Sequence, residues 1–179
     1  MSDLNGKIAV VLTGDERTDR LAGALSGAAW VELRLDRFLA GHQRDDPLQW
    51  ASAVRRVFGG RIIATVRSEA EAGERSVRIA DEERETLYRG ALRWADYVDV
   101  ELNSNIAGVV VKLAQTSGRQ AILSVHNFSG TPPHRAMMAS LGRCRRMGGD
   151  VFKIAARASS PGDLMTLIWF THRAAGQFP

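Results

Sequence analysis

The stretch Asp150-Val151-Phe152-Lys153-Ile154-Ala155-Ala156 places one cation in an apolar run that predicts a buried β-strand. A buried ammonium is costly unless it is paired, and burial lowers the pKa of a lysine toward a neutral, nucleophilic amine. Such an amine can form a Schiff base with a ketone or an aldehyde. The alternative for Lys153 is a strand-end lysine whose head group reaches water.

Apolar, β-branched runs of this kind recur along the chain and alternate with helix-like segments. Their near-continuous hydrophobicity is typical of parallel strands covered on both faces. The expected strands are 8–13, 30–36, 61–67, 97–102, 121–128 and 151–156. Six β-then-α units in a row predict an α/β fold with right-handed crossovers.

Capping signals mark three of the expected helices. Asp46, Pro47 and Gln49 form an N-cap, a first-turn proline and a capping-box glutamine ahead of 50–58. Thr131-Pro132 opens a segment that runs to 147, and the capping box Ser160 to Asp163 precedes 164–172. Helices at 17–29, 79–94 and 105–117 are expected in the remaining gaps.

Two architectures fit this alternation. A doubly wound sheet usually has a glycine-rich phosphate turn after its first strand, and Thr13-Gly14-Asp15-Glu16 is not one. A (β/α)8 TIM barrel instead carries reactive residues at the carboxyl ends of several strands. Here five expected strands end in or near polar residues, a pattern that packing does not explain: Asp36, Arg67, Glu101, His126 and Lys153. The sequence therefore predicts one TIM-barrel-type α/β domain over residues 1–179.

The number of units falls short of a closed barrel. Successive expected strands begin about 29 residues apart, so two more units would give about 237 residues, near the ~250 typical of the fold. We therefore expect about six βα units in this chain. Further residues or another chain should then cover the sheet edges.

The bulk composition excludes several classes of protein. With 179 residues, 45% hydrophobic and 25% charged, the chain has ordinary globular composition. No apolar run approaches membrane-spanning length and no signal-peptide core is present, so we expect a cytoplasmic protein without membrane contact. The single cysteine, Cys144, excludes an internal disulfide. The net charge of +4 comes from scattered arginines, so we expect no nucleic-acid partner, whereas an anionic small substrate is compatible.

Five segments stand in a fixed order and spacing: VELRLD (31–36), TVRSEAEAG (65–73), DYVDVEL (96–102), SVHNF (124–128) followed by Thr131-Pro132, and DVFKIA (150–155). Together they resemble the type I 3-dehydroquinate dehydratases from about residue 8 to 167. The resemblance implies a (β/α)8 barrel, often a homodimer, that needs no metal or organic cofactor. It also implies dehydration of 3-dehydroquinate to 3-dehydroshikimate in the shikimate pathway to aromatic amino acids.

That reaction explains the need for an amine and a base. The α-proton of a ketone is too weakly acidic for a side-chain base at neutral pH, but a protonated imine is an electron sink that makes it removable. By resemblance, Lys153 forms the Schiff base, and His126 is the general base and acid. Glu71 matches the carboxylate that orients this histidine. A structural histidine and an exposed loop glutamate are the alternatives.

Three further residues match substrate-binding positions. The guanidinium fork of Arg67 can hold hydroxyl or carboxylate oxygens, and its alternative is a surface ion pair with Glu69 or Glu71. Glu32 and Arg34 share one strand face. By resemblance they bind ring hydroxyls, and the alternative is a structural Glu–Arg pair inside the barrel. We expect charges that support the catalytic set and Arg34 from Asp36, Asp99 and Glu101.

Two other functions stay open. Another class I, Schiff-base aldolase-like lyase would share Lys153 but would not need the set of His126, Arg67 and Glu32-Leu33-Arg34. A non-catalytic barrel remnant could act as a binding or interaction module, because the family's carboxylate-binding arginine and serine–glutamine lid belong to its last two units. No metal site is expected, since the other three histidines lack ligand spacing: His42, His134 and His172.

Overall fold

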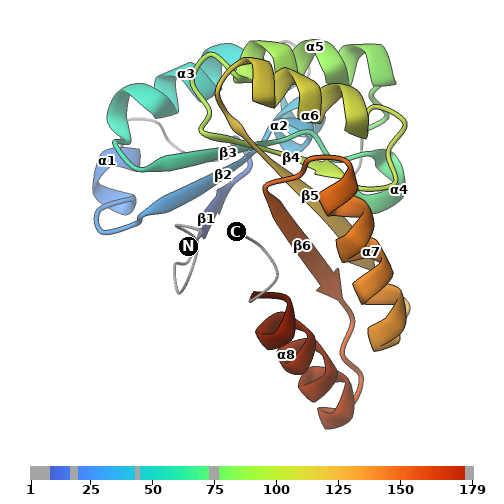
Figure 1. Ribbon diagram of the computed structural model, residues 1–179. Helices are drawn as coiled ribbons and strands as arrows, with labels where there is room; N and C mark the ends of the chain where they lie inside the picture. The colour runs from blue at the N-terminus through green and yellow to red at the C-terminus, as the bar shows by residue number, and fades with distance from the viewer. Residues whose placement is uncertain (1–8, 17–19, 43–44, 73–76, 176–179) are drawn as a thin grey trace.

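A computed structural model describes residues 9–16, 20–42, 45–72 and 77–175, which form one six-stranded sheet with helices on its outer face (Figure 1). All neighbouring strands are parallel, in the order β1-β2-β3-β4-β5-β6. They are β1 (Ala9–Leu12), β2 (Trp30–Arg34), β3 (Arg61–Thr65), β4 (Tyr97–Glu101), β5 (Gln120–Asn127) and β6 (Val151–Ala156). Because spatial order follows chain order without a switch point, the predicted TIM-barrel-type fold is confirmed and the doubly wound alternative is wrong.

Helices separate the strands: α1 (Leu21–Ala24), α2 (Leu35–Gly41), α3 (Pro47–Val57), α4 (Glu69–Ala72), α5 (Asp81–Ala91), α6 (Ala107–Thr116), α7 (His134–Arg146) and α8 (Pro161–Ala175). In Figure 1, α3, α5 and α6 lie side by side over the outer face, and α7 packs on α8 beyond β6. Two of the three expected capping signals are confirmed, whereas α7 begins at His134 after Pro133 and has no side-chain cap. Asp46 accepts the Leu48 N–H at 2.8 Å, and Ser160 and Asp163 bond each other reciprocally.

Several expected boundaries were wrong, and three of them matter most for the fold. The second strand ends at Arg34, because Leu35 and Phe38 turn into the core as the short helix α2. The third strand ends at Thr65, before the short helix α4. The helix expected from 17 is a single turn at Leu21–Ala24, and residues 17–19 lie outside the described residues, as do Ile8 and Gly73.

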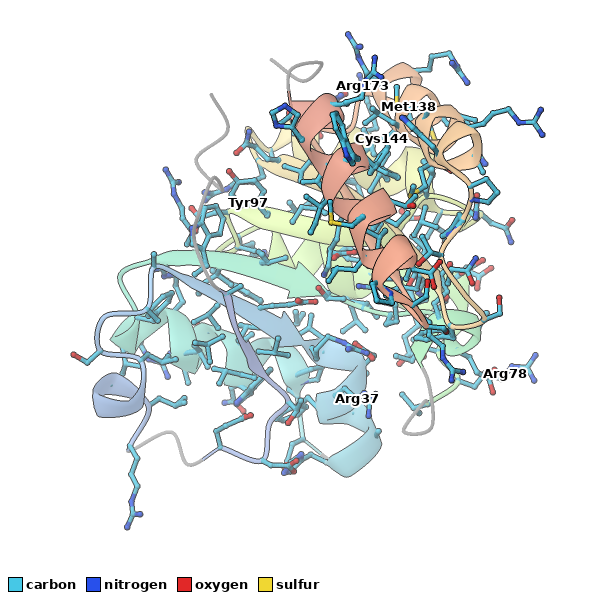
Figure 2. The ribbon with its side chains drawn as sticks, turned by 90° about the horizontal axis from the view of Figure 1, so that it is seen from below. Arg37, Arg78, Tyr97, Met138, Cys144 and Arg173 are labelled. Atoms are coloured by element: carbon cyan, nitrogen blue, oxygen red, sulfur yellow. The ribbon has the colours of Figure 1, made fainter. Side chains whose placement is uncertain are left out.

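The main core lies between the sheet and its helices. Alternate strand residues such as Val31, Leu33, Val98 and Leu123 are fully buried there. Each side chain of this kind contributes about 1.5–3 kcal/mol relative to exposure. Cys144 of α7 is also fully buried in this core, with Sγ 3.7 Å from Val151 O (Figure 2).

The inner face of the sheet changes from apolar to polar along the strands. Successive side chains point to opposite faces, so every second residue faces inward. Near the amino ends, the inward residues form an apolar cluster of Trp30, Ile63, Tyr97 and Ile122, with Val151 against it. Two residues further along the same strands they are polar: Glu32, Thr65, Asp99, Ser124 and Lys153. The inner face of the sheet thus has an apolar layer near the amino ends of the strands and a polar layer next to it, toward the carboxyl ends.

The edge strands are less buried than predicted. In β1, Ala9, Val10 and Val11 are exposed, and no residue of β6 is fully buried. The expectation of a buried strand around Lys153 was therefore wrong, because β6 pairs only with β5 among the described residues. Helix α8 also exposes more than half of Leu164, Met165, Ile168 and Trp169. Within the described ranges, no helix is long and apolar enough to cross a membrane.

Candidate active site

Lys153 extends from β6 toward two carboxylates. Its Nζ lies 2.9 Å from Asp99 Oδ2 and 3.4 Å from Glu32 Oε2. Burial alone would lower the pKa of Lys153, but the charges of Asp99 and Glu32 outweigh burial and raise that pKa above its ordinary value. The predicted low pKa was therefore wrong, because the sequence did not show that β2 and β4 bring two anions to this amine.

Asp99 is the buried centre of the cluster. Its Oδ1 accepts hydrogen bonds from Ser124 Oγ at 2.6 Å and from Arg67 Nη1 at 3.1 Å. Burial would raise the pKa of this carboxyl, but Arg67 and Lys153 outweigh burial and lower the pKa to about 2. Asp99 is thus an anion at neutral pH, and its expected contacts with the catalytic set are present.

Arg67 follows β3 and is only 3% exposed. Its Nη1 also contacts Ser124 Oγ at 2.7 Å and Glu101 Oε1 at 3.4 Å. The alternative of a surface ion pair with Glu69 or Glu71 is therefore wrong. The buried charges around Arg67 hold its guanidinium beside the polar layer.

His126 stands near the carboxyl end of β5, where its Nδ1 lies 2.7 Å from Glu71 Oε2 of α4. A carboxylate only accepts, so this contact favours the proton on Nδ1 and leaves Nε2 as the free base. The expected pairing of His126 with Glu71 is present, and the alternative of an exposed loop glutamate is wrong, since the Glu71 side chain is 17% exposed.

Glu32 and Arg34 do not pair with each other. Glu32 Oε1 accepts a hydrogen bond from Thr65 Oγ1 at 2.8 Å, and its other oxygen faces Lys153. Arg34 instead forms a bidentate ion pair with Asp36, in which Nε donates to Oδ1 at 3.0 Å and Nη2 donates to Oδ2 at 2.6 Å. The structural Glu32–Arg34 pair is therefore wrong, whereas the expected support of Arg34 by Asp36 is confirmed.

Sequence reasoning missed two buried polar residues of α5. Arg84 is 2% exposed and Tyr88 is fully buried, and both lie behind the carboxyl ends of β3 and β4. A signal was available, because Arg84 shares a helical stripe with Leu87, Tyr88 and Ala91, the core side of α5. An arginine on such a stripe requires a buried anion, which Glu101 provides.

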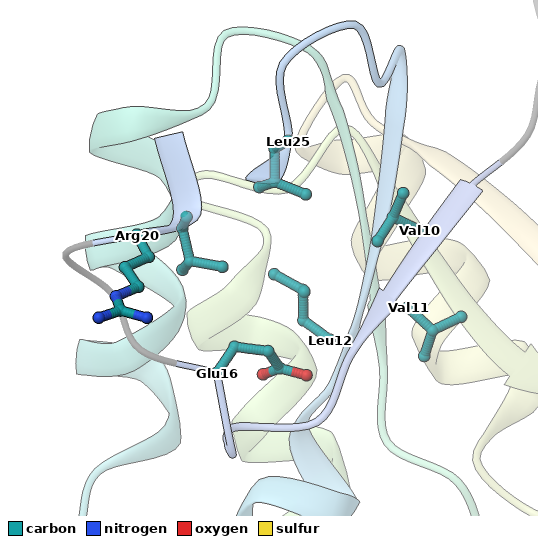
Figure 3. Close-up of a pocket in the computed structure, with 7 residues that line it drawn as sticks. Val10, Val11, Leu12, Glu16, Arg20 and Leu25 are labelled. Atoms are coloured by element: carbon teal, nitrogen blue, oxygen red, sulfur yellow. The ribbon is translucent and has the colours of Figure 1, made fainter. Parts of the chain in front are cut away.

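A hollow of about 470 Å³ lies elsewhere, beside the edge strand β1 (Figure 3). None of the predicted site residues lines it; the lining consists of Val10, Val11, Leu12, Glu16, Arg20, Leu21 and Leu25. Among the described side chains, no group of three or more His, Cys, Asp or Glu could hold a metal ion. The converging charges therefore place the candidate site at the carboxyl ends of the strands.

The arrangement combines the groups that imine chemistry needs. In the β5–β6 ladder Ser124 pairs with Lys153 and His126 with Ala155, so the imidazole stands on the same face as the amine and two residues nearer the strand ends. A carbonyl compound that entered from the strand ends would meet the imidazole above the amine. The site can therefore condense with a carbonyl and then move a proton on it.

A family model and curated relatives point to the same family. A model of the type I 3-dehydroquinase family matches residues 8–179. The 3-dehydroquinate dehydratase of Thermococcus gammatolerans is 41% identical over 130 residues, which covers 72% of this chain and 56% of that protein. The 3-dehydroquinate dehydratase of Thermodesulfovibrio yellowstonii is 30% identical over 166 residues, covering 93% of this chain and 70% of that protein.

Solved structures show the same fold. The crystal structure of 3-dehydroquinate dehydratase from Aquifex aeolicus superimposes with a TM-score of 0.78 at 30% identity, covering 94% of this chain and 75% of that one. The enzyme from Geobacillus kaustophilus gives a TM-score of 0.81 at 24% identity, covering 95% of this chain and 69% of that one. The chain thus spans between about half and three-quarters of the length of these proteins.

Proposed function

Because this chain belongs to the type I 3-dehydroquinase family, we propose that it dehydrates 3-dehydroquinate to 3-dehydroshikimate through a Schiff base on Lys153. The observation that carries the proposal is the Lys153 amine and the His126 imidazole on one face of neighbouring strands, with Glu71 at Nδ1 of the imidazole. The related 3-dehydroquinate dehydratases support the choice of substrate.

The first step is formation of the imine. The Lys153 ammonium loses a proton, and the free amine adds to the carbonyl carbon of the substrate. Asp99 and Glu32 are the two carboxylates in contact with Nζ and are therefore the proton acceptors within reach. Loss of water from the adduct gives a protonated imine, which withdraws electrons from the neighbouring carbon.

The second step is elimination. Nε2 of His126 removes the α-proton, and the C–H electron pair forms an enamine. These electrons then expel the β-hydroxyl, which takes the proton back from the imidazolium and leaves as water. Hydrolysis of the product imine releases the product and restores Lys153. Glu71 fixes the imidazole so that Nε2 faces the substrate.

Substrate binding falls to the remaining polar groups. Glu32 contacts the amine, whereas Arg34 ends β2 and Arg67 follows β3, and these three groups offer charged partners for the hydroxyl and carboxylate groups of the ring. On the family resemblance we also propose that the protein acts in the shikimate pathway as a homodimer without metal or organic cofactor, and its single cysteine fits a reducing cytoplasm.

Borohydride trapping tests this function. The chain has three lysines, Lys7, Lys112 and Lys153, so a reduced adduct with 3-dehydroquinate can be mapped to one peptide. We expect the adduct on Lys153, and we expect Lys153→Ala to lose both trapping and the ultraviolet signal of the conjugated product. Lys112→Ala, an exposed position on α6, is the matched control and should behave like the unchanged protein.

Two results would contradict the proposal. Full turnover by Lys153→Ala would remove the Schiff base from the mechanism. Substrate binding without any adduct or turnover in the unchanged protein would instead favour the non-catalytic binding module.

A further inference from the structure

The pairing of β3 with β4 stops early. Their ladder joins three residue pairs and ends at Thr65 opposite Asp99, whereas β2–β3 and β4–β5 each join five. β4 nevertheless continues to Glu101. The strands therefore part at the carboxyl end, directly below the segment that carries Arg67 and Glu71.

Two side chains of α5 fill this gap. The Tyr88 hydroxyl accepts the Val66 N–H at 3.3 Å and donates to Asp99 O at 2.6 Å. Arg84 donates to Val66 O from Nε at 3.2 Å and from Nη2 at 3.0 Å. The peptide groups on both sides of Val66, which would pair with β4 in a regular ladder, are thus held by a helix.

Arg84 has all three nitrogens engaged. Besides Val66 O, Nη2 contacts Glu101 Oε2 at 2.5 Å, and Nη1 donates to Asp81 Oδ1 at 3.1 Å and Ser104 Oγ at 3.0 Å. Burial would lower the pKa of this guanidinium, but its interactions with Tyr88 and Glu101 outweigh burial and raise that pKa. Arg84 is thus a buried, permanently charged group with a fixed orientation.

Glu101 connects Arg84 to the residues of the site. While Oε2 is held by Arg84, Oε1 accepts the Ser68 N–H at 2.7 Å and contacts Arg67 Nη1 at 3.4 Å. Ser68 O in turn accepts the Glu71 N–H at 3.0 Å, and Glu71 contacts His126. An unbroken series of contacts therefore leads from a helix on the outer face to the imidazole on the inner face.

We propose that Arg84 is a positioning residue for the reaction, which acts through Glu101 to fix the start of α4 and so places Glu71 against His126. The proposal rests on the proposed function for its effect on turnover, whereas the placement of Glu71 does not depend on it. Arg84 touches neither the amine nor the imidazole, so it has no direct part in bond making.

The test compares Arg84→Leu with Arg89→Leu. Arg89 lies on the same helix but is 61% exposed and pairs only at the surface with Glu85, so its variant is the matched control. The first readout is the ¹⁵N spectrum of the His126 ring, assigned by its loss in His126→Gln. We expect Arg84→Leu to move the ring from mainly Nδ1-protonated toward a mixture of tautomers, and Arg89→Leu to leave it unchanged.

The second readout is catalytic. We expect Arg84→Leu to lower kcat by about 10-fold or more, but by less than the ~10²–10⁴-fold contribution of the general acid–base group that it positions, while borohydride still traps the imine on Lys153. If the unchanged protein shows no turnover, the proposed function fails, but the ring spectrum still tests the placement of Glu71. An unchanged His126 spectrum in Arg84→Leu overturns the proposal, even where the melting temperature falls.

Two milder variants keep the test decisive if Arg84→Leu does not fold. Glu101→Gln preserves the shape of the partner but removes its charge, and we expect the same change in the His126 spectrum. Arg84→Lys keeps the charge but cannot span Val66 O and Glu101 with a rigid fork, so we expect partial restoration. A His126 spectrum that matches the unchanged protein in both variants would assign Arg84 a purely structural role.

Discussion

Lys153 Nζ lies 2.9 Å from Asp99 Oδ2, and the two side chains differ in burial, because the lysine is 36% exposed and the aspartate is 0% exposed. The Lys153 ammonium is therefore within reach of a substrate, whereas the carboxylate of Asp99 that pairs with it is fully buried. Since the charge of Asp99 raises the pKa of Lys153, the free amine is the minor form at neutral pH. The rate at which Lys153 attacks a ketone should thus depend on pH. The pKa that sets this dependence is controlled by Asp99, a residue that the substrate does not touch.

Replacing Asp99 should shift the pH dependence of imine formation. Asp99→Asn removes the main charge that raises the pKa of Lys153, so this pKa falls and the free amine appears at lower pH. We expect the alkaline rise in the rate of borohydride trapping to move to lower pH. Ser124→Ala, which removes a hydrogen bond to Asp99 but no charge, is the control. An alkaline rise that stays in place in Asp99→Asn would contradict this prediction.

Asp99 should also contribute to stability against acid. Its pKa falls from 3.8 to about 2 on folding. The contribution is therefore present above the ordinary pKa and is lost as the pH drops from about 4 toward 2. A shift of this size corresponds to ~2 kcal/mol. Urea unfolding across this pH range should show a steeper loss of stability in the unchanged protein than in Asp99→Asn, and parallel curves would refute the assignment.

His126 should be needed after the imine forms. We expect His126→Ala to be trapped by borohydride on Lys153 while turnover falls by about 10²–10⁴-fold, the usual contribution of a general acid–base group. Glu71→Gln keeps a partner at Nδ1 but loses its charge, so we expect a smaller loss of turnover. Loss of trapping together with turnover in His126→Ala would mean that the imidazole acts earlier than proposed.

The exposed apolar residues of α8 should promote self-association of the 179-residue chain in solution. Apolar patches of this kind usually bury themselves against another surface. We expect Trp169→Glu, at a side chain that is 59% exposed, to raise the monomer fraction in sedimentation velocity. The control is Val57→Glu on α3, which is 46% exposed and lies away from α8. Equal monomer fractions in the two variants would place the contact elsewhere.

The sequence predicted the fold better than it predicted which residues contact each other in the site. Strand order and most helices followed from local patterns, because each apolar run and each cap acts within a few residues. Support of the catalytic set by Asp99 was expected, but the contacts of Lys153 Nζ with Asp99 and Glu32 did not follow from local patterns, because they join residues 54 and 121 positions apart. Arg84 could have been found from its place on the apolar stripe of α5, but its partner Glu101 lies on a different element and was not predictable from that stripe.

The order of the strands also bears on how the chain is made. Each strand pairs with the strand before it, so the sheet can grow from the amino end as the polypeptide leaves the ribosome, without waiting for a distant partner. Glu32, Asp99 and Glu101 are all synthesised before Lys153. Arg67 and Arg84 can neutralise Asp99 and Glu101 early, but the amine that contacts both Glu32 and Asp99 arrives only when β6 joins the sheet. Among the charged residues of the site that the structure describes, the reactive lysine is therefore the last to be synthesised.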